Sequence, residues 1–230
     1  MTPPGGNGFG VIWDVDGTLV DTAELHFRAW EAIGEQQQRP FSRAEFAATF
    51  GRRNPEIIAE VYGTHFTEQE ITDLGEQKEV LYRAAARQHG VALLPGVRRL
   101  LEGLQRAGFR QAIGSSAPRA NVNLIMRLTK AEPLFDAIVS MEDTERGKPD
   151  PQVFLVAAER VRVQPPRCLV MEDAVAGVEA AKAGGMKCVA VRFVGHHSEE
   201  KLKAAGADLV VPTLEQVSVQ TIRKLIGNHG

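Results

Sequence analysis

The chain has 230 residues, enough for one sizeable core or for a main domain with a smaller inserted one. Its 27 basic and 29 acidic residues give a formal charge of −2 and are spread along the chain without long blocks. This balance excludes the strongly basic surface of a nucleic-acid-binding protein and the charged patch that an anionic membrane attracts, so we expect a small-molecule partner.

No apolar run approaches the roughly 20 residues that cross a bilayer. The opening MTPPGGNG lacks the basic start and apolar stretch of a signal peptide. We therefore expect a cytoplasmic protein, as a monomer or weak homo-oligomer. Cys168 and Cys188 lie in strand-like apolar runs and are interpreted as buried thiols rather than as a disulfide or metal ligands.

The first predicted strand is the apolar run 9–13, which ends at two aspartates. Apolar residues at helical spacing follow over residues 24–33. Three pairs of residues mark further helix starts: Ser42 with Glu45, Thr67 with Glu70, and Asn54 with Pro55. The first two pairs fit capping boxes, and the third fits an N-cap followed by a first-turn proline. We expect about four helices between residues 22 and 90, with no strand among them.

From residue 93 onward, short apolar runs alternate with helical segments. Five further strands are predicted, over residues 110–114, 137–140, 168–171, 188–193 and 209–211. Gly108, Gly184 and Gly206 are expected to follow helix ends before three of them. Because each parallel strand needs a crossover, this alternation predicts an α/β fold with a Rossmann-like parallel sheet and helices on both faces. The core comprises residues 1–20 and 93–230, with an all-helical insert over 21–92.

Polar side chains follow four of the predicted strands, where open α/β sheets bind their ligands. They are Asp14 and Asp16 in DVDGT, Ser115 and Ser116 in GSS, Lys148 in GKPDP, and Glu172 and Asp173 in MEDAVAG. Uncompensated negative charge is costly to bury, so the acidic groups imply a hard cation. Oxygen ligands without nearby His or Cys suit Mg²⁺, which favours sites where a phosphate completes its coordination shell.

This set of residues indicates phosphoryl transfer. Lys148, Ser115 and backbone amides near Gly17 are suited to hold phosphoryl oxygens. Asp14 and Asp16 lie two positions apart in an extended segment and point to the same side. One can attack phosphorus, while the other protonates the leaving oxygen and later activates water.

Two nearby hydroxyls are further substrate-binding candidates. Thr18 either stabilises the loop or touches the phosphate. Ser116 is a second candidate beside Ser115, and the residues alone do not separate the two serines.

The four motifs, in this order, resemble the haloacid dehalogenase superfamily over nearly the whole chain. The resemblance implies that Asp14 is the nucleophile and a Mg²⁺ ligand. It implies that Asp16 is the general acid and base and binds the metal through its backbone carbonyl. Ser115, which the resemblance favours over Ser116, and Lys148 would then clamp the transferring group.

The same resemblance extends to the acidic pair and to the helical insert. It implies that Asp173 is a second carboxylate ligand and that Glu172 lies in or next to the metal shell. The insert resembles the cap of the subgroup that includes β-phosphoglucomutase and many sugar-phosphate phosphatases. Substrate choice is expected to reside there, because the core motifs meet only phosphate and metal.

Five cap residues are candidates for substrate binding. By resemblance to the mutase cap, His26 and Lys78 engage the sugar; the alternatives are a half-exposed helix histidine and a solvated lysine. FGRRNPEII departs from the mutase pattern, because Asn54 stands where the mutase has an arginine that grips a second phosphate. Arg52 and Arg53 stand just before it and are candidates for that grip.

The sequence thus predicts a Mg²⁺-dependent phosphatase that cleaves a small phosphorylated metabolite, a sugar phosphate, through an aspartyl-phosphate. The alternative is β-phosphoglucomutase-type isomerisation of β-glucose 1-phosphate and glucose 6-phosphate. A third, less favoured interpretation is an inactive binding protein on the same fold. His196 and His197 are interpreted as a solvated loop pair rather than a metal site.

Overall fold

The computed structural model describes residues 8–227. The prediction that the chain begins without a signal peptide concerns the opening segment MTPPGGNG. Most of this segment lies outside the described residues. Within residues 8–227, no helix combines the length and apolar character needed to cross a membrane.

Six parallel strands form one sheet in the order β3-β2-β1-β4-β5-β6. The strands are β1 (Gly10–Trp13), β2 (Arg110–Gly114), β3 (Ala137–Val139), β4 (Cys168–Glu172), β5 (Lys187–Val191) and β6 (Leu209–Val211). The fully buried β1 lies in the middle, and its last residue, Trp13, pairs with Ile113 of β2 and Met171 of β4. The carboxyl ends of these three strands therefore lie side by side, where ligands of such sheets bind.

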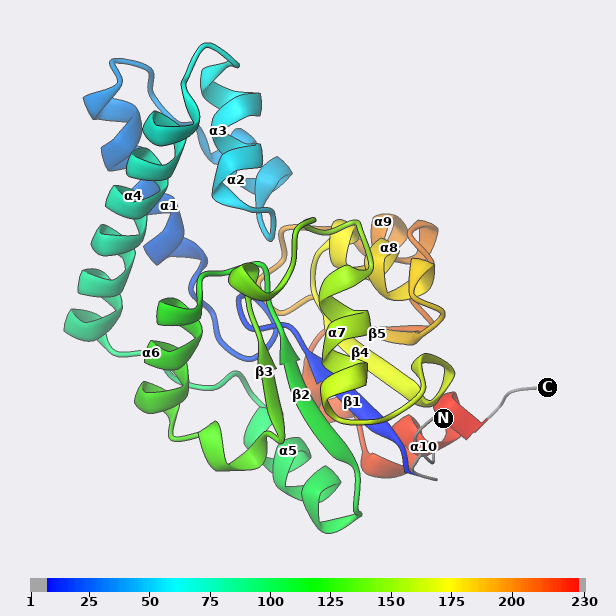
Figure 1. Ribbon diagram of the computed structural model, residues 1–230. Coiled ribbons are helices and arrows are strands. Elements are labelled where there is room, and N and C mark those ends of the chain that lie inside the picture. The colour runs from blue at the N-terminus through cyan, green and yellow to red at the C-terminus, as the bar shows by residue number, and fades with distance from the viewer. Residues whose placement is uncertain (1–7, 228–230) are drawn as a thin grey trace.

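Helices cover both faces of the sheet (Figure 1). One face packs against α5 (Val97–Arg106), α6 (Arg119–Thr129) and α10 (Val219–Gly227), and the other against α7 (Gln152–Arg160), α8 (Val175–Ala183) and α9 (Glu199–Ala204). Because strand side chains alternate, Val11 and Trp13 join the first cluster and Ile12 the second. Four short 3₁₀ helices span Glu132–Leu134, Met141–Asp143, Pro165–Arg167 and Leu214–Gln216. The predicted α/β fold is confirmed.

A separate helical cap follows β1 (Figure 1). It consists of α1 (Ala23–Gln36), α2 (Arg43–Thr49), α3 (Asn54–Tyr62) and α4 (Glu68–His89). These four helices enclose a hydrophobic cluster of their own, with Trp30, Phe46 and Ile58 among its buried residues. The prediction of four helices without a strand is confirmed for residues 23–89.

The helix starts in the cap follow the sequence closely, with one exception. Both predicted capping boxes are present, Ser42 with Glu45 and Thr67 with Glu70. The prediction that Asn54 is an N-cap is wrong, because Arg53 is the N-cap and Asn54 and Pro55 are the first two residues of α3. Arg53 has the extended backbone of an N-cap residue, and the proline ring tolerates the second helical position, where the N–H has no partner in the helix.

Several strand ends in the core differ from prediction by one or two residues. β1 begins at Gly10 instead of residue 9, β3 ends at Val139 instead of residue 140, β4 ends at Glu172 instead of residue 171, and β5 begins at Lys187 instead of residue 188. β5 ends at Val191 instead of residue 193, because its partner β6 ends at Val211, which pairs with Val191. Gly184 follows the end of α8 as predicted, but the left-handed backbone, with φ of 71°, belongs to Gly185.

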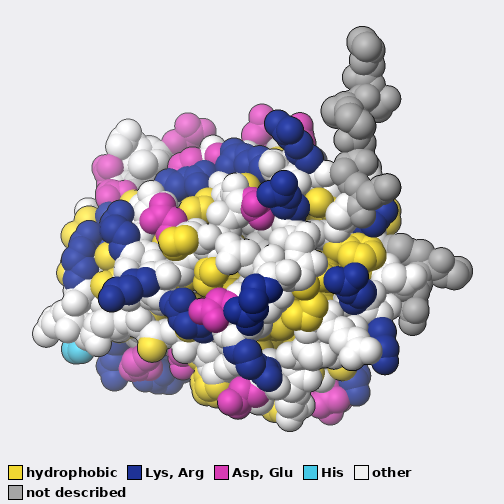
Figure 2. Space-filling view, turned by 90° about the horizontal axis from the view of Figure 1, so that it is seen from below, with side chains coloured by type: hydrophobic (Ala, Val, Ile, Leu, Met, Phe, Trp, Pro, Cys, Tyr) yellow, Lys and Arg dark blue, Asp and Glu magenta, His cyan; other side chains and the backbone are white. Residues whose placement is uncertain are grey.

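Charges of both signs are interspersed on the face that Figure 2 shows, at the end of the molecule away from the cap. Lys and Arg alternate there with Asp and Glu around small hydrophobic areas. This face therefore carries no large area of one sign, in keeping with the near-neutral composition.

Candidate active site

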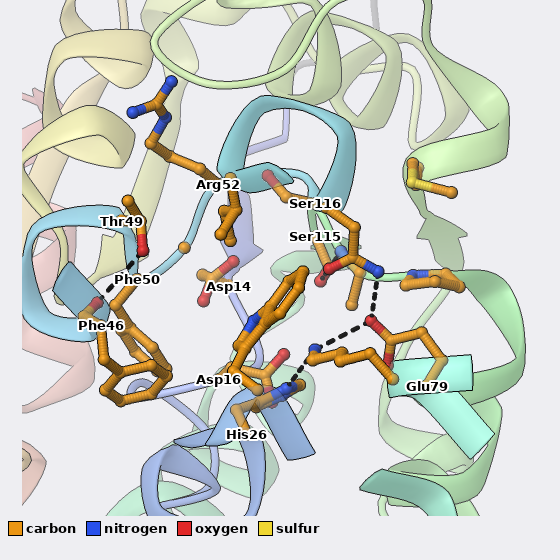
Figure 3. A pocket seen from close by; sticks show the side chains of 18 residues that line it. Asp14, Asp16, His26, Phe46, Thr49, Phe50, Arg52, Glu79, Ser115 and Ser116 are labelled. Atoms are coloured by element: carbon orange, nitrogen blue, oxygen red, sulfur yellow. Dashed lines mark hydrogen bonds and ion pairs between the residues drawn. The ribbon is translucent and has the colours of Figure 1, made fainter. Parts of the chain in front are cut away.

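A cavity lies between the cap and the carboxyl ends of β1 and β2. Figure 3 shows Asp14 and Asp16 within it, between two serines and two phenylalanines. The labelled serines are Ser115 and Ser116, from the segment after β2, and the phenylalanines are Phe46 and Phe50, from the cap. The cavity is therefore lined both by the core motifs and by the helical cap, which is expected to select the substrate.

The turn after β1 depends on a glycine. Gly17 has a φ of 88°, and a Cβ at this position would lie 2.0 Å from Asp173 Oδ2. Only glycine lets the backbone approach the second acidic motif this closely. The buried Thr18 donates its hydroxyl to Asp173 Oδ1 at 3.4 Å, so this side chain links the first motif to the last.

A buried lysine joins two carboxylates. Lys148, in the segment before α7, donates from Nζ to Asp14 Oδ1 and to Glu172 Oε1, both at 2.6 Å. Glu172 Oε2 in turn accepts from the backbone amides of Asp173 and Ala174, at 2.7 and 2.8 Å. Glu172 is thus held by its own strand end and fixes the lysine that faces Asp14.

The acidic cluster is suited to a hard cation. Asp14, Glu172 and Asp173 are buried, and each offers an oxygen within 4.8 Å of the others. Burial raises the pKa of Asp14 to about 8, with Lys148 opposing and Glu172 reinforcing the rise. Burial and the neighbouring carboxylates also raise the pKa of Asp173. One ammonium does not offset three carboxylates, and an all-oxygen donor set fits Mg²⁺.

A chain of polar contacts runs from Asp16 into the cap. Asp16 accepts from the Thr22 hydroxyl and from His26 Nε2, the latter at 3.2 Å. Lys78 Nζ lies 2.8 Å from His26 Nδ1, and a protonated Lys78 leaves the histidine proton on Nε2, facing Asp16. Burial acts to raise the pKa of Asp16, but His26, Thr22 and Lys78 lower it below its ordinary value.

The surface alternatives for the two cap residues are wrong. His26 is 8% exposed and Lys78 only 3% exposed, because α1 and α4 pack against each other and enclose both side chains. The ring of His26 also stacks on Tyr82, with ring centroids 3.9 Å apart. Both residues line the cavity.

Glu79 is a cavity residue that the sequence analysis missed. Its Oε1 accepts from Lys78 Nζ at 2.9 Å and from Asn54 Nδ2 at 2.8 Å, and its Oε2 accepts from Asn121 Nδ2 at 2.6 Å. Burial acts to raise the pKa of Glu79, but Lys78, His26 and the two amides lower it to about 2. The only local signal is the adjacent Lys78, and such a pair is usual on an exposed helix face.

The three candidates in FGRRNPEII have different surroundings. Arg52 and Asn54 line the cavity, whereas Arg53 is not among the lining residues that the structure describes. Arg52 pairs with Glu56 and Glu60 of α3. Arg53 donates to the core segment 144–146. Both arginines therefore already have protein partners.

The two serines differ in their partners. Ser115 Oγ accepts from the Ala117 amide at 3.1 Å. Ser116 Oγ is buried at the cavity wall and has no hydrogen-bond partner among the described residues. The Ser116 hydroxyl is therefore free to bind a ligand.

The prediction of a solvated histidine pair is wrong. His196 and His197 are half-buried, and the His196 ring lies 4.7 Å from Phe50 and 5.5 Å from Phe46, centroid to centroid. Burial lowers the pKa of both histidines. The reason is tertiary: the segment after β5 packs against α2 of the cap.

The interpretation of the two cysteines as buried thiols is confirmed, since Cys168 and Cys188 are free and buried in β4 and β5.

The chain is similar to known proteins over most of its length. A family model for haloacid dehalogenase-like hydrolases matches residues 11–191. The chain is 34% identical over 220 residues to "Beta-phosphoglucomutase" of Bacillus subtilis, with 93% of each chain covered. It is 28% identical to "Phosphorylated carbohydrates phosphatase" of Thermotoga maritima, with 91% of this chain and 96% of the relative covered.

The fold has a close match among solved structures. Beta-phosphoglucomutase from Clostridium difficile superposes with a TM-score of 0.85, covering 96% of this chain and 97% of the other, at 24% identity. The chain belongs to the haloacid dehalogenase-like hydrolase family. Within it, the chain is a phosphoric monoester hydrolase with a β-phosphoglucomutase-like fold and a helical cap.

Proposed function

We propose that the protein is a Mg²⁺-dependent phosphatase that hydrolyses a sugar phosphate through an aspartyl-phosphate on Asp14. The observation that carries this proposal is the buried cluster of Asp14, Lys148 and Asp173, which come from three distant segments and of which Asp14 lines the cavity. The family match and the phosphorylated-carbohydrate phosphatase among the relatives support it. Residues 1–20 and 93–230 act as the catalytic core, and residues 21–92 as the cap.

Asp14 is the nucleophile in this proposal. Lys148 binds Asp14 Oδ1, so the other carboxylate oxygen is available to attack phosphorus. The new bond joins this oxygen to phosphorus, and the bond from phosphorus to the sugar oxygen breaks. Asp14, Asp173 and the Asp16 carbonyl, with Glu172 in or beside the shell, would hold Mg²⁺, which neutralises charge on the phosphoryl oxygens when bound.

Asp16 is the general acid and base in this proposal. It gives a proton to the leaving sugar oxygen and then accepts one from the water that hydrolyses the aspartyl-phosphate. Its lowered pKa suits the second of these steps, in which the ionised carboxylate is a base. The first step needs the protonated form of Asp16, and His26 Nε2, 3.2 Å away, holds the Asp16 side chain in place by a hydrogen bond.

The cavity wall suits a hydroxyl-bearing monophosphate. Trp30 and Phe50 supply apolar surface, and Ser116, Asn54 and Glu79 supply polar groups. The free Ser116 hydroxyl and the amide of Asn54 are suited to sugar hydroxyls. The cations at the cap end, Arg52 and Lys78, are already paired with glutamates, so a second phosphate finds no unpaired cation in the described lining.

Mutase-type isomerisation is the second candidate, favoured by the 34% identity to the Bacillus subtilis protein. A mutase must hold a bisphosphate while the sugar turns over, and a bidentate arginine is the group suited to this task. Asn54 at this position, with Arg52 and Arg53 bound elsewhere, ranks isomerisation below hydrolysis. An inactive binding protein is disfavoured, because Asp14 and Lys148 are both present and in contact.

The test is a panel of sugar monophosphates incubated with Mg²⁺, with released phosphate measured throughout and glucose 6-phosphate measured for β-glucose 1-phosphate. We expect free phosphate as the main product. Asp14→Asn should lower kcat by about 10³-fold or more while the protein stays folded, because the amide is not a nucleophile. Asp21→Asn, an exposed matched control in the same segment, should retain kcat within about two-fold.

Two results would change the proposal. Glucose 6-phosphate as the main product would establish the mutase reaction instead. Full phosphatase activity in Asp14→Asn would contradict the assignment of the nucleophile.

A further inference from the structure

One arginine of the cap binds the core segment that leads into Lys148. We propose that Arg53 is a positioning residue: it binds residues 144–147 when the cap covers the site and thereby holds Lys148 against Asp14 and Glu172. The assignment of Lys148 to catalysis rests on the proposed function, whereas the contact and its effect on Lys148 stand on geometry.

Arg53 makes four hydrogen bonds to this segment. Nη1 donates to the Glu145 carbonyl at 3.0 Å, and Nη2 donates to the carbonyls of Thr144 and Arg146 at 3.1 and 2.8 Å. Nη2 also contacts the Thr144 hydroxyl. A planar guanidinium has five N–H donors in a rigid fork, so one side chain can bind three consecutive carbonyls, which a lysine cannot match.

The same segment is held from the core through its amides. Gln152 Oε1, at the start of α7, accepts from the amides of Glu145 and Arg146 at 3.0 and 2.9 Å. The core thus binds the N–H groups of this segment, and the cap binds its carbonyl groups. A movement of the cap away from the core would break the hydrogen bonds from Arg53 to the carbonyl groups and leave those from the amides to Gln152 intact.

Gly147 makes the close approach of the arginine possible. A Cβ at this position would lie 3.0 Å from Arg53 Cδ and 2.4 Å from Glu56 Oε1. The aliphatic part of Arg53 therefore lies across the backbone one residue before Lys148. Figure 1 shows the chain after α2 reaching down from the cap to the core at this point.

Lys148 is sensitive to the placement of this backbone. It is 2% exposed, and its Nζ lies 2.6 Å from both carboxylates, so it has little room to move. Because residues 146 and 148 are separated by one glycine, a displaced Arg146 carbonyl moves the Lys148 backbone. Cap closure and lysine placement are therefore coupled through Arg53.

The experiment compares Arg53→Ala, Arg53→Lys and Gly147→Ala with a control, Arg43→Ala. Arg43 is also a cap arginine, but its guanidinium binds Glu24 within the cap, at 2.8 and 3.0 Å. The readout independent of turnover is acetylation of lysines by acetic anhydride, followed by mass spectrometry. Exposed Lys201 serves as the internal reference.

We expect Lys148 to be acetylated about ten-fold faster in Arg53→Ala than in the wild type, because the opened segment exposes Nζ more often. Amide hydrogen exchange over residues 144–148 should accelerate in the same variant. Gly147→Ala, a change in the core segment itself, should also accelerate both Lys148 acetylation and amide exchange. For Arg53→Lys we expect rates between those of the wild type and Arg53→Ala. Arg43→Ala should have the rates of the wild type.

Kinetics give a second readout on the sugar phosphate found in the panel. Arg53→Ala should lower kcat about ten-fold, since a misplaced Lys148 weakens binding of the transferring group, and Arg53→Lys should restore part of it. Wild-type acetylation of Lys148 in Arg53→Ala, or faster acetylation with unchanged kcat, would overturn the proposal. If the wild type releases no phosphate at all, the proposed function fails, and the acetylation comparison alone decides whether Arg53 positions Lys148.

Discussion

At the scale of single residues, Glu79 shows how a charge is kept inside the molecule. Three donors face its carboxylate, one each from Lys78, Asn54 and Asn121. Asn121 belongs to α6 of the core, while Glu79 belongs to α4 of the cap. Glu79 Oε2 accepts from Asn121, and Glu79 Oε1 accepts from Asn54 of α3. Glu79 therefore connects the cap helices to each other and to the core.

This arrangement makes the stability contribution of Glu79 dependent on pH. The pKa of Glu79 lies near 2 instead of the ordinary 4.5, so its contribution is present above about pH 4.5 and is lost as the pH falls towards 2. Glu79→Gln should lower the free energy of unfolding at pH 7 by about 1–3 kcal/mol and flatten its decline between pH 5 and 2. Urea unfolding across this range measures both, with exposed Glu68→Gln as the control. Parallel curves for Glu79→Gln and wild type would contradict the role of the carboxylate.

At the scale of an element, α8 is shaped to admit a carboxylate from the strand before it. A Cβ at Gly177, in its first turn, would lie 1.7 Å from Glu172 Oε1. The same Glu172 oxygen accepts from Lys148. Glycine is unfavourable in a helix, so its presence here has a packing reason: it leaves the space in which Glu172 binds the lysine.

Gly177→Ala should therefore destabilise the protein although alanine is the better helix former. We expect a loss of about 1–3 kcal/mol in unfolding free energy, because Glu172 must leave its position. Gly75→Ala in α4 is the matched control, since its Cβ would meet nothing closer than 3.5 Å. The control should be neutral or stabilised by up to about 1 kcal/mol. Chemical denaturation measures both variants, and equal effects would refute this reason for Gly177.

At the scale of the whole molecule, the fold gathers negative charge at one edge of the sheet. Asp14 follows β1, and Glu172 and Asp173 stand at the end of β4, its neighbour in the sheet. Lys148 is the cation that contacts two of them. Repulsion between these carboxylates lowers the stability of the folded state, and a bound divalent cation would reduce this repulsion.

Removal of metal should therefore cost more stability at high pH. The pKa of Asp14 is raised to about 8 from 3.8, so without a cation the folded state retains a proton that the unfolded state gives up, and stability falls as the pH rises between these values. We expect Mg²⁺ to raise the melting temperature by a few degrees at pH 8 and by less at pH 5, with excess EDTA reversing the rise. Differential scanning calorimetry would disprove this account if Mg²⁺ had no effect at pH 8.

The amino-acid sequence by itself determined the parts that depend on neighbours along the chain. Apolar runs of strand length, capping boxes and glycines past helix ends are local patterns, and they predicted the parallel sheet and the four cap helices. The site motifs were equally local: each follows a strand, and strand ends of a parallel sheet meet at one edge. The acidic residues, Lys148 and the serines could therefore be predicted as one site without coordinates.

Only the tertiary structure decided which polar groups are buried and what they face. Lys78 and His196 have the sequence surroundings of solvated residues, yet one is enclosed between α1 and α4 and the other packs on Phe50. The partner of Arg53 lies 92 residues away in the chain, at Glu145. Such contacts depend on how cap and core pack together, and side-chain burial between distant segments leaves no periodic trace in the sequence.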